Sequence, residues 1–280
     1  MAGPEGDYRI YADLADWWPL ISPPREYSAE SAYLAALLDR ALGLDRALRQ
    51  EQALGQEQTP RGTAEVLDLG SGGGHVAVHL KDKFRLTLVD ISEEMLAVSE
   101  RLVPLAPHVR GDMRSVRLGR TFDAVLVHDA IDYIIGTDDL RLAVETAAAH
   151  CRPGGVVLFV PDYVKDTFDE LIGGGGGGVD EAGRTASFSE RTWDPDPGDD
   201  WVQADYEFTL RTADGDEKVI CESHRLSAFS RETWRIELAR AGLCLDPEGA
   251  AARAGQPALP GREPDNLFLT RKPVLGQQHR

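Results

Sequence analysis

The stretch Ala64–Val78 reads AEVLDLGSGGGHVAV, with four glycines in the five positions Gly70–Gly74. The apolar pair Val66 and Leu67 is typical of a short buried strand, and residues 75–80 can follow a helical course. A strand, a glycine turn and a helix that runs back along the strand begin a βαβ unit. Because glycine lets a ligand approach the backbone and a helix N-terminus attracts anions, this turn predicts a site for a nucleotide-type cofactor.

The glycine spacing distinguishes between cofactors. A dinucleotide fingerprint requires glycine or alanine five residues after its first glycine, and that position here is His75. His75 and the acid at Asp68 therefore disfavour a nicotinamide oxidoreductase. The pattern D-x-G-x-G-x-G from Asp68 resembles motif I of class I S-adenosylmethionine (SAM) methyltransferases. This resemblance implies that the cofactor-binding residues include Asp68, Gly70, Ser71, Gly72 and Gly74.

Composition limits the partners. The chain has 47 acidic and 30 basic residues, a formal net charge of −17. Binding to nucleic acid requires a basic patch, and no Lys/Arg run occurs, so we expect no nucleic-acid partner. The longest apolar runs, such as Val156–Val160, have the length of a strand, so we expect no membrane span. The acidity indicates a well-hydrated surface, and it would also attract a cationic amine substrate.

The cysteines and the N-terminus indicate the compartment. Cys151, Cys221 and Cys244 are far apart and lack metal-ligand spacing, so we expect reduced core residues and no metal site. The start, MAGPEGDY, has no basic segment followed by an apolar stretch, which predicts no signal peptide and a cytoplasmic location. The expected partner is a small-molecule acceptor, and a homodimer is a possible assembly.

The order of elements predicts an α/β fold: a Rossmann-like, mostly parallel seven-stranded sheet with helices on both faces, plus an antiparallel β insertion as a substrate cap. Strand-like runs alternate with helical segments from residue 64 to residue 160. The expected division is a helical cap (1–60), a SAM-binding core (61–163), a glycine-rich loop with the insertion (164–229), and a C-terminal helix with the last strand (230–280).

The N-terminal part is expected to be helical. Residues 8–18 place aromatic and aliphatic side chains on one helical face, and Pro19, Pro23 and Pro24 are expected to break that helix. A second helix is predicted over Ser28–Leu42, followed by a polar linker over 49–63. Ser92 and Ser230 are typical caps for two later helices.

The sequence pattern changes after residue 163. Six consecutive glycines, Gly173–Gly178, predict a mobile loop, with a substrate lid as the alternative. Residues 186–229 alternate as strands do, and Asp214-Gly215 is typical of a hairpin turn. Arg152–Gly155 is expected to form a turn before the fifth core strand.

The remaining cofactor residues follow strand ends, where open α/β sheets bind their ligands. Asp90 closes the second strand and can accept hydrogen bonds from both ribose hydroxyls, and the resemblance makes it the ribose acid. Asp112 and Met113 resemble the family's GDM-like segment, which implies contacts to adenine. Ile91 and Met95 would flank the adenine or ribose.

Further segments are similar to amino-sugar N,N-dimethyltransferases, namely YADLADWW near the N-terminus, EYSAE, GDMR followed by FDAVLV, and the late antiparallel strands. This resemblance implies that the N-terminal segment and the insertion cover the cofactor and hold the substrate. It also implies that Tyr11 approaches the methionyl end of SAM and that Tyr133 lies near the acceptor. His128-Asp129 and the hexaglycine run depart from the pattern.

Methyl transfer from a sulfonium needs no metal, but an amine acceptor must first lose a proton. Asp129 and Tyr133 are the predicted catalytic groups, together with His128 closer to the cofactor. The predicted substrate residues are Trp18, Asp132, Asp162, Tyr163 and His224. The predicted function is SAM-dependent methyl transfer to a small molecule, with an amine nitrogen favoured. O-methylation, or SAM binding without transferase activity, are the alternatives.

Overall fold

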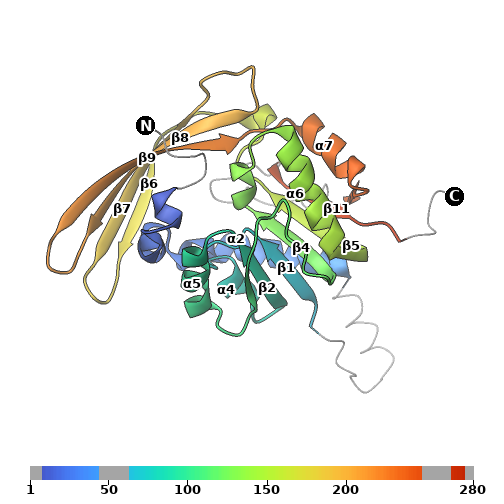
Figure 1. Ribbon diagram of the computed structural model, residues 1–280, viewed down its shortest axis with the longest axis horizontal. Helices are drawn as coiled ribbons and strands as arrows, with labels where there is room; N and C mark the ends of the chain where they lie inside the picture. Colours follow the sequence, from blue (N-terminus) through green and yellow to red (C-terminus); the bar gives the residue numbers. More distant parts are fainter. Residues whose placement is uncertain (1–7, 44–62, 248–265, 275–280) are drawn as a thin grey trace.

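The computed structural model describes residues 8–43, 63–247 and 266–274. Its larger sheet has seven strands in the order β10-β11-β5-β4-β1-β2-β3 (Figure 1). The neighbours from β5 to β3 are parallel, whereas β11 is antiparallel to β5 and β10. The strands are β1 (Glu65–Leu69), β2 (Arg85–Asp90), β3 (His108–Arg110), β4 (Phe122–His128), β5 (Cys151–Val160), β10 (Cys244–Leu245) and β11 (Phe268–Arg271). The predicted mostly parallel seven-stranded sheet is confirmed.

Helices cover both faces of this sheet. Successive side chains of a strand point to opposite faces, so the central strands contribute to a separate apolar core on each side. One core joins the sheet to α2 (Ser28–Leu42) and α4 (Ala77–Leu80). The other joins it to α6 (Thr137–His150) and α7 (Arg231–Arg240). The predicted caps are present, because Ser92 Oγ accepts from Met95 N before α5 (Glu93–Leu102) and Ser230 caps α7.

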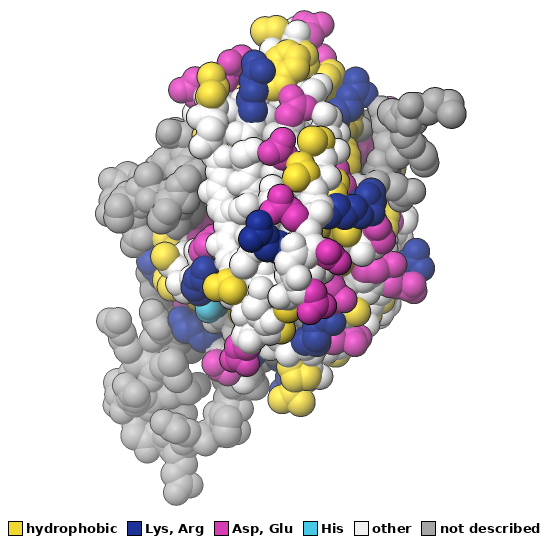
Figure 2. Space-filling view, turned by 90° about the vertical axis from the view of Figure 1, so that its left-hand side faces the viewer, with side chains coloured by type: hydrophobic (Ala, Val, Ile, Leu, Met, Phe, Trp, Pro, Cys, Tyr) yellow, Lys and Arg dark blue, Asp and Glu magenta, His cyan; other side chains and the backbone are white. Residues whose placement is uncertain are grey.

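The insertion forms a second, antiparallel sheet in the order β6-β7-β8-β9. Its strands are β6 (Leu171–Val179), β7 (Thr185–Trp193), β8 (Trp201–Arg211) and β9 (Glu217–Ser227). Gly215, at φ +93°, lies in the tight turn between β8 and β9, as the Asp-Gly signal predicts. Figure 2 shows the side of the molecule where this sheet lies, and acidic and basic side chains are interspersed over it.

The prediction of a mobile loop over Gly173–Gly178 is wrong, because these glycines lie in the edge strand β6. Gly174–Gly178 pair in register with Ala186–Glu190 of β7. A Cβ on Gly177 would collide with the carbonyl oxygen of Ala186. The missing side chains therefore let this strand lie close to its neighbour.

The N-terminal segment lies between the two sheets (Figure 1). It consists of short turns rather than the predicted single helix over 8–18: η1 (Arg9–Tyr11), η2 (Ala15–Trp17), α1 (Trp18–Ile21) and η3 (Pro24–Tyr27). Pro19 does not end a helix, because it lies in the first turn of α1, where no backbone N–H is needed. α1 packs against β6 and β7. The predicted linker over 49–63 lies, except for its last residue, outside the described residues.

The predicted turn over Arg152–Gly155 is instead a bulge within β5. The pairing with β4 passes from Phe122 opposite Cys151 to Ala124 opposite Val156, so four residues of β5 oppose Asp123 alone. A Cβ on Gly155 would lie 2.7 Å from the Asp123 carbonyl oxygen, which explains the glycine at this close approach.

The expectation of three core cysteines holds only for Cys151. Cys221 and Cys244 are exposed, and all three are unpaired. Within the described ranges, no helix is long and apolar enough to cross a membrane.

Candidate active site

The glycine turn after β1 adopts backbone conformations that favour glycine. Gly70, Gly72 and Gly74 have φ values of +82°, +52° and +77°. A Cβ on Gly70 would lie 2.5 Å from Ala130 Cβ, so this position has no room for a side chain. At Gly72 the nearest atom to such a Cβ is Met95 Cε at 3.6 Å, so space above this residue is open. The turn thus offers a ligand direct access to the backbone at Gly72.

The helix predicted after the glycines is shorter than expected. α4 spans only Ala77–Leu80, and residues 71–76 form turns. The N-terminus of α4 is therefore too short a helix end to bind an anion, and the ligand must be held by the turn and its neighbouring side chains.

Asp90, at the end of β2, holds the glycine turn in place. Its Oδ2 accepts from Gly72 N at 2.8 Å, and its Oδ1 accepts from Ser92 N at 2.9 Å. Burial raises the pKa of Asp90, although the two backbone N–H groups act in the opposite direction. Each carboxylate oxygen keeps a further lone pair, which suits a ligand that donates two hydroxyl hydrogens.

Asp68 and Ser71 carry polar atoms that no described residue satisfies. Asp68 is 3% exposed, and its Oδ1 and the Ser71 hydroxyl have no hydrogen-bond partner among the described residues. Burial raises the pKa of Asp68 to about 7, while nearby His128 lowers it and Asp90 raises it. Unsatisfied buried polar groups beside an open glycine turn are expected where a polar, cationic ligand group binds.

Asp112 and Met113 lie in the loop after β3, beside the same turn. Gly111 N donates to Asp90 O at 2.9 Å, and a Cβ on Gly70 would lie 2.7 Å from Met113 Cε. Partial burial acts to raise the pKa of Asp112, but hydrogen bonds from Arg114 leave it below its ordinary value. Arg114 thus orients the carboxylate that the resemblance assigns to adenine.

Apolar surface flanks the turn. Met95 is buried, whereas Ile91 is 61% exposed immediately after Asp90, where it can contact a ligand. Trp18, which is predicted at the substrate, also lies against the cofactor turn: a Cβ on Gly73 would come within 2.9 Å of it, and it stacks on His75.

Three segments far apart in sequence meet in an aromatic cluster, which we define as Tyr8, Tyr11, Tyr133, Tyr206 and His224. Tyr11 Oη and Tyr133 Oη are 2.8 Å apart, and Tyr133 Oη is 2.9 Å from His224 Nδ1. Tyr8 stacks on His224 with ring centroids 3.7 Å apart. The Tyr11 carbonyl accepts from Ser92 Oγ at 2.6 Å, so this residue joins the cluster to the cofactor turn.

His128 and Asp129 follow β4 on the cofactor side of the cluster. His128 Nδ1 is 3.1 Å from Asp129 Oδ1, and its Nε2 is 3.1 Å from Glu30 Oε1. Asp129 has φ +38°, an unusual conformation for a residue with a side chain. The glycine turn packs beneath it, since Gly70 contacts the next residue, Ala130.

The predicted substrate residues after β5 are close to this loop. Asp132 Oδ2 accepts from Asp162 N at 2.8 Å. The Tyr163 hydroxyl lies 3.3 Å from Thr192 Oγ1 and 3.4 Å from Glu190 Oε1 in the second sheet. Burial raises the pKa of Tyr163, which keeps its hydroxyl protonated.

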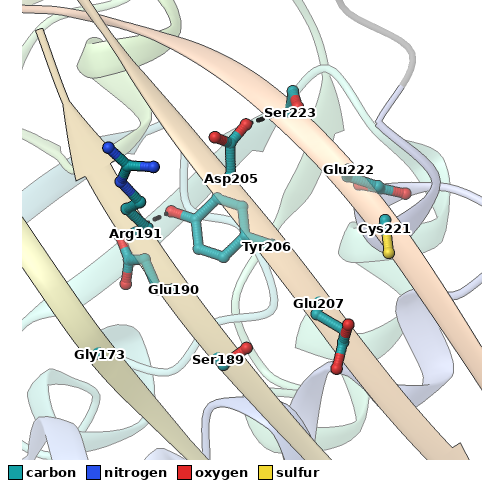
Figure 3. A pocket seen from close by; sticks show the side chains of 10 residues that line it. All are labelled: Gly173, Ser189, Glu190, Arg191, Asp205, Tyr206, Glu207, Cys221, Glu222 and Ser223. Atoms are coloured by element: carbon teal, nitrogen blue, oxygen red, sulfur yellow. Dashed lines mark hydrogen bonds between the residues drawn. The ribbon is translucent and has the colours of Figure 1, made fainter.

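Four residues of the site were not predicted from the sequence: Tyr8, Glu190, Tyr206 and Glu222. Glu190, Tyr206 and Glu222 are paired across β7, β8 and β9, and Tyr206 donates to Glu190 Oε1 at 3.1 Å (Figure 3). The only signal for Glu222 is its spacing from His224, because residues two apart in a strand share a face.

A shallow hollow of about 500 Å³ over the same strands has Ser189, Glu207, Cys221 and Ser223 among its exposed lining residues. Strand alternation places these four side chains on the opposite face from Tyr206 and His224, so the aromatic cluster lies on the other side of the sheet. Within the described part of the chain, no group of His, Cys, Asp and Glu could hold a metal ion.

These residues fit SAM. The open backbone at Gly72, the two-oxygen acceptor Asp90 and the buried carboxylate of Asp68 match a ligand with ribose hydroxyls and an ammonium group. A Rossmann-like sheet of this strand order with such a turn at its first strand end defines a class I SAM-dependent methyltransferase.

Comparison with known proteins agrees. A family model described as "Methyltransferase domain" matches residues 66–155. The dTDP-3-amino-3,6-dideoxy-alpha-D-glucopyranose N,N-dimethyltransferase of Streptomyces fradiae is 32% identical over 270 residues, which is 93% of this chain and 95% of that enzyme. The dTDP-3-amino-3,4,6-trideoxy-alpha-D-glucopyranose N,N-dimethyltransferase of Streptomyces venezuelae is 31% identical over 160 residues, 56% of this chain and 60% of its own.

Solved structures are similar over most of the chain. Streptomyces venezuelae DesVI has a TM-score of 0.72 at 23% identity, with 94% of this chain and 99% of DesVI covered. SAM-bound CalS10, an amino pentose methyltransferase from Micromonospora echinaspora, has a TM-score of 0.60 at 25% identity, with 87% and 96% covered.

The chain therefore belongs to the family of small-molecule SAM-dependent methyltransferases that includes the S. fradiae enzyme. It transfers a methyl group from SAM to a small-molecule acceptor, and the predicted fold class, enzyme class and cofactor are confirmed.

Proposed function

We propose that the chain methylates the amino nitrogen of a deoxysugar that is linked to a nucleoside diphosphate. The observation that carries this proposal is the near full-length similarity to the S. fradiae enzyme, which extends over the second sheet as well as the cofactor half. Both Streptomyces relatives are named for amino groups on dTDP-linked deoxysugars. A similarity confined to residues 66–155 would support the cofactor alone.

On the cofactor side, Asp90 would accept hydrogen bonds from the ribose hydroxyls, and Asp68 would face the methionyl ammonium. Asp112 and Met113 would contact adenine, with Ile91 against the ring. SAM supplies the methyl group as an electrophile on its sulfonium. Tyr11 would lie where the two halves meet, because its carbonyl is bonded to Ser92 and its hydroxyl to Tyr133.

On the acceptor side, the carboxylates of Asp129, Asp132 and Asp162 favour a cationic ammonium over a phosphate. This arrangement supports entry of the sugar with its amino group toward the loop after β4 and its nucleotide directed away. Tyr133, Asp129 and His128 are the groups that would receive the proton of the amine. Tyr163, which follows β5, would line the sugar, and His224 would support this side from β9 through its hydrogen bond to Tyr133.

Catalysis would depend mainly on positioning. Holding an amine in line with a methyl group contributes roughly 7–11 kcal/mol, and a positioned base typically adds 10²–10⁴-fold. The enclosure formed by the N-terminal segment and the second sheet would exclude water while the amine is neutral.

The test is mass spectrometry of the products formed by the purified chain with SAM. The acceptors are nucleoside-diphosphate deoxysugars with an amino group, the same sugars with a hydroxyl in its place, and simple phenols. We expect one or two added methyl groups on the amino sugars only. Methylation of the hydroxyl sugars or phenols with the amines untouched would overturn the proposal in favour of O-methylation.

A homodimer, a cytoplasmic location and the division of the chain at residues 60, 163 and 229 stay predictions. Light scattering of the purified chain tests the first of these.

A further inference from the structure

A continuous line of hydrogen bonds runs from the partly buried tyrosines into the second sheet. Tyr11 Oη lies 2.8 Å from Tyr133 Oη, which lies 2.9 Å from His224 Nδ1. His224 Nε2 in turn lies 2.9 Å from Glu222 Oε2. Tyr133 and Tyr11 are partly buried, whereas the side chain of His224 is 1% exposed and that of Glu222 is 9% exposed. The line therefore has one end near the expected acceptor and the other inside the protein.

The chemistry of these groups fixes the direction of the bonds. An ionised carboxylate only accepts, so His224 donates from Nε2 to Glu222 and its Nδ1 carries a lone pair. The Tyr133 hydroxyl must then donate to His224 Nδ1, and it accepts from the Tyr11 hydroxyl. A second lone pair on the Tyr133 oxygen is left for an N–H of a ligand.

Neither Tyr11 nor Tyr133 is stable as a tyrosinate. Burial raises the pKa of Tyr133 well above its ordinary value, and it also raises that of Tyr11. A proton accepted by Tyr133 must therefore be matched by one that it passes on, and His224 Nδ1 is the neighbour able to accept it. Packing holds the imidazole in position, since Tyr8 stacks on one face and the Tyr206 ring lies 4.8 Å away.

We propose that Glu222, His224 and Tyr133 form a proton relay that deprotonates the acceptor amine, an inference that rests on the proposed function. The N–H bond of the ammonium breaks and its proton moves to Tyr133 Oη, while the Tyr133 hydroxyl proton moves to His224 Nδ1. The amine becomes neutral, Tyr133 stays neutral, and the imidazolium is balanced by Glu222. No electrons are exchanged with a co-reactant. The freed nitrogen lone pair then forms the bond to the methyl carbon as the carbon–sulfur bond breaks.

Glu222 is in this account a positioning residue, because it acts through His224. Its Oε1 has no hydrogen-bond partner among the described residues, so the side chain is dedicated to His224 through Oε2. The carboxylate fixes the tautomer that presents a lone pair to Tyr133, and its charge stabilises the imidazolium.

The test compares full-length variants with an amine that the wild type methylates. His224→Asn and His224→Ala should lower kcat about 100-fold or more, with KM and SAM affinity within about twofold. Glu222→Gln should fall between these and the wild type. The double variant Tyr133→Phe/His224→Ala should have a kcat no lower than that of the slower single variant, because either substitution alone already interrupts the relay. Glu207→Gln, on the exposed opposite face of β8, is the matched control.

Chemical rescue separates a proton-transfer role from a structural one. Added imidazoles should restore turnover to His224→Ala, and the restored rate should rise with the basicity of the imidazole. Rescue that is independent of basicity, a loss of SAM affinity equal to the loss of kcat, or unchanged kcat in His224→Asn would each overturn the relay. If the wild type methylates no amine at all, the proposed function fails instead.

Discussion

Replacing Asp68 with asparagine should remove a pH dependence of SAM binding that the wild type shows near neutrality. Asp68 is buried, its Oδ1 lacks a partner among the described residues, and burial raises its pKa to about 7. The cofactor-free protein is therefore about half protonated at this residue near pH 7. A bound ammonium favours the charged carboxylate, so SAM binding must release a proton.

The magnitude follows from this titration. As the pH falls from about 7.5 to about 6, the protonated fraction rises and wild-type affinity should weaken roughly fivefold to tenfold. In Asp68→Asn a charge-assisted hydrogen bond worth about 1.5–3 kcal/mol is lost, so affinity at pH 7.5 should fall roughly ten- to hundredfold. The ligand's own titration is common to both proteins, so the difference between their profiles belongs to Asp68.

Isothermal titration calorimetry measures both quantities. At pH 7, in two buffers of different ionisation enthalpy, the wild type should release about half a proton per SAM bound, and Asp68→Asn close to none. Glu207→Gln should behave as the wild type. Equal proton release in the wild type and Asp68→Asn would refute the reasoning, as would parallel pH profiles.

Other expectations concern stability and the cofactor turn. Burial raises the pKa of Asp68 in the folded chain, so the free energy of unfolding should be highest below about pH 4, where the residue is protonated in both states, and should decline toward pH 7. Thermal unfolding without cofactor should show a decline of at most about 4 kcal/mol, and Asp68→Asn should lack it. Asp90→Ala should weaken S-adenosylhomocysteine binding at least about tenfold in calorimetry, and an unchanged affinity would remove Asp90 from the site. Gly177→Ala should destabilise the protein by about 1–3 kcal/mol in urea, whereas Gly174→Ala, whose closest contact is the flexible Leu171 side chain, should cost less; equal values would mean that backbone approach does not explain β6. Ser92→Ala should cost about 1 kcal/mol of unfolding free energy by removing the α5 cap, and no loss would show that the cap is unimportant.

The parts of the fold that the sequence predicted are those with a local cause. The glycine turn, the caps at Ser92 and Ser230 and the Asp214-Gly215 hairpin each depend on a few adjacent residues, and the structure contains all of them. The acid at Asp90 could be located because a strand end fixes the position of the residue that follows it.

The errors have non-local causes. Six glycines have no intrinsic preference for a strand, and β6 forms by pairing with β7, where a Cβ on Gly175 or Gly177 would collide with a carbonyl oxygen of β7. The N-terminal turns are shaped by packing between two sheets that are distant in sequence. The role of Glu222 was not predicted for the same reason, since it depends on Tyr133, which lies 89 positions earlier in the chain.

The most direct measurement of the central claim is a crystal structure with S-adenosylhomocysteine and a nucleoside-diphosphate amino sugar. We expect the amino nitrogen within hydrogen-bond reach of Tyr133 Oη and directed at the sulfur, at a distance that leaves room for the transferred methyl group. We also expect the diphosphate to lie away from Asp129 and Asp162. A sugar hydroxyl directed at the sulfur, or an amino group remote from Tyr133, would contradict the account.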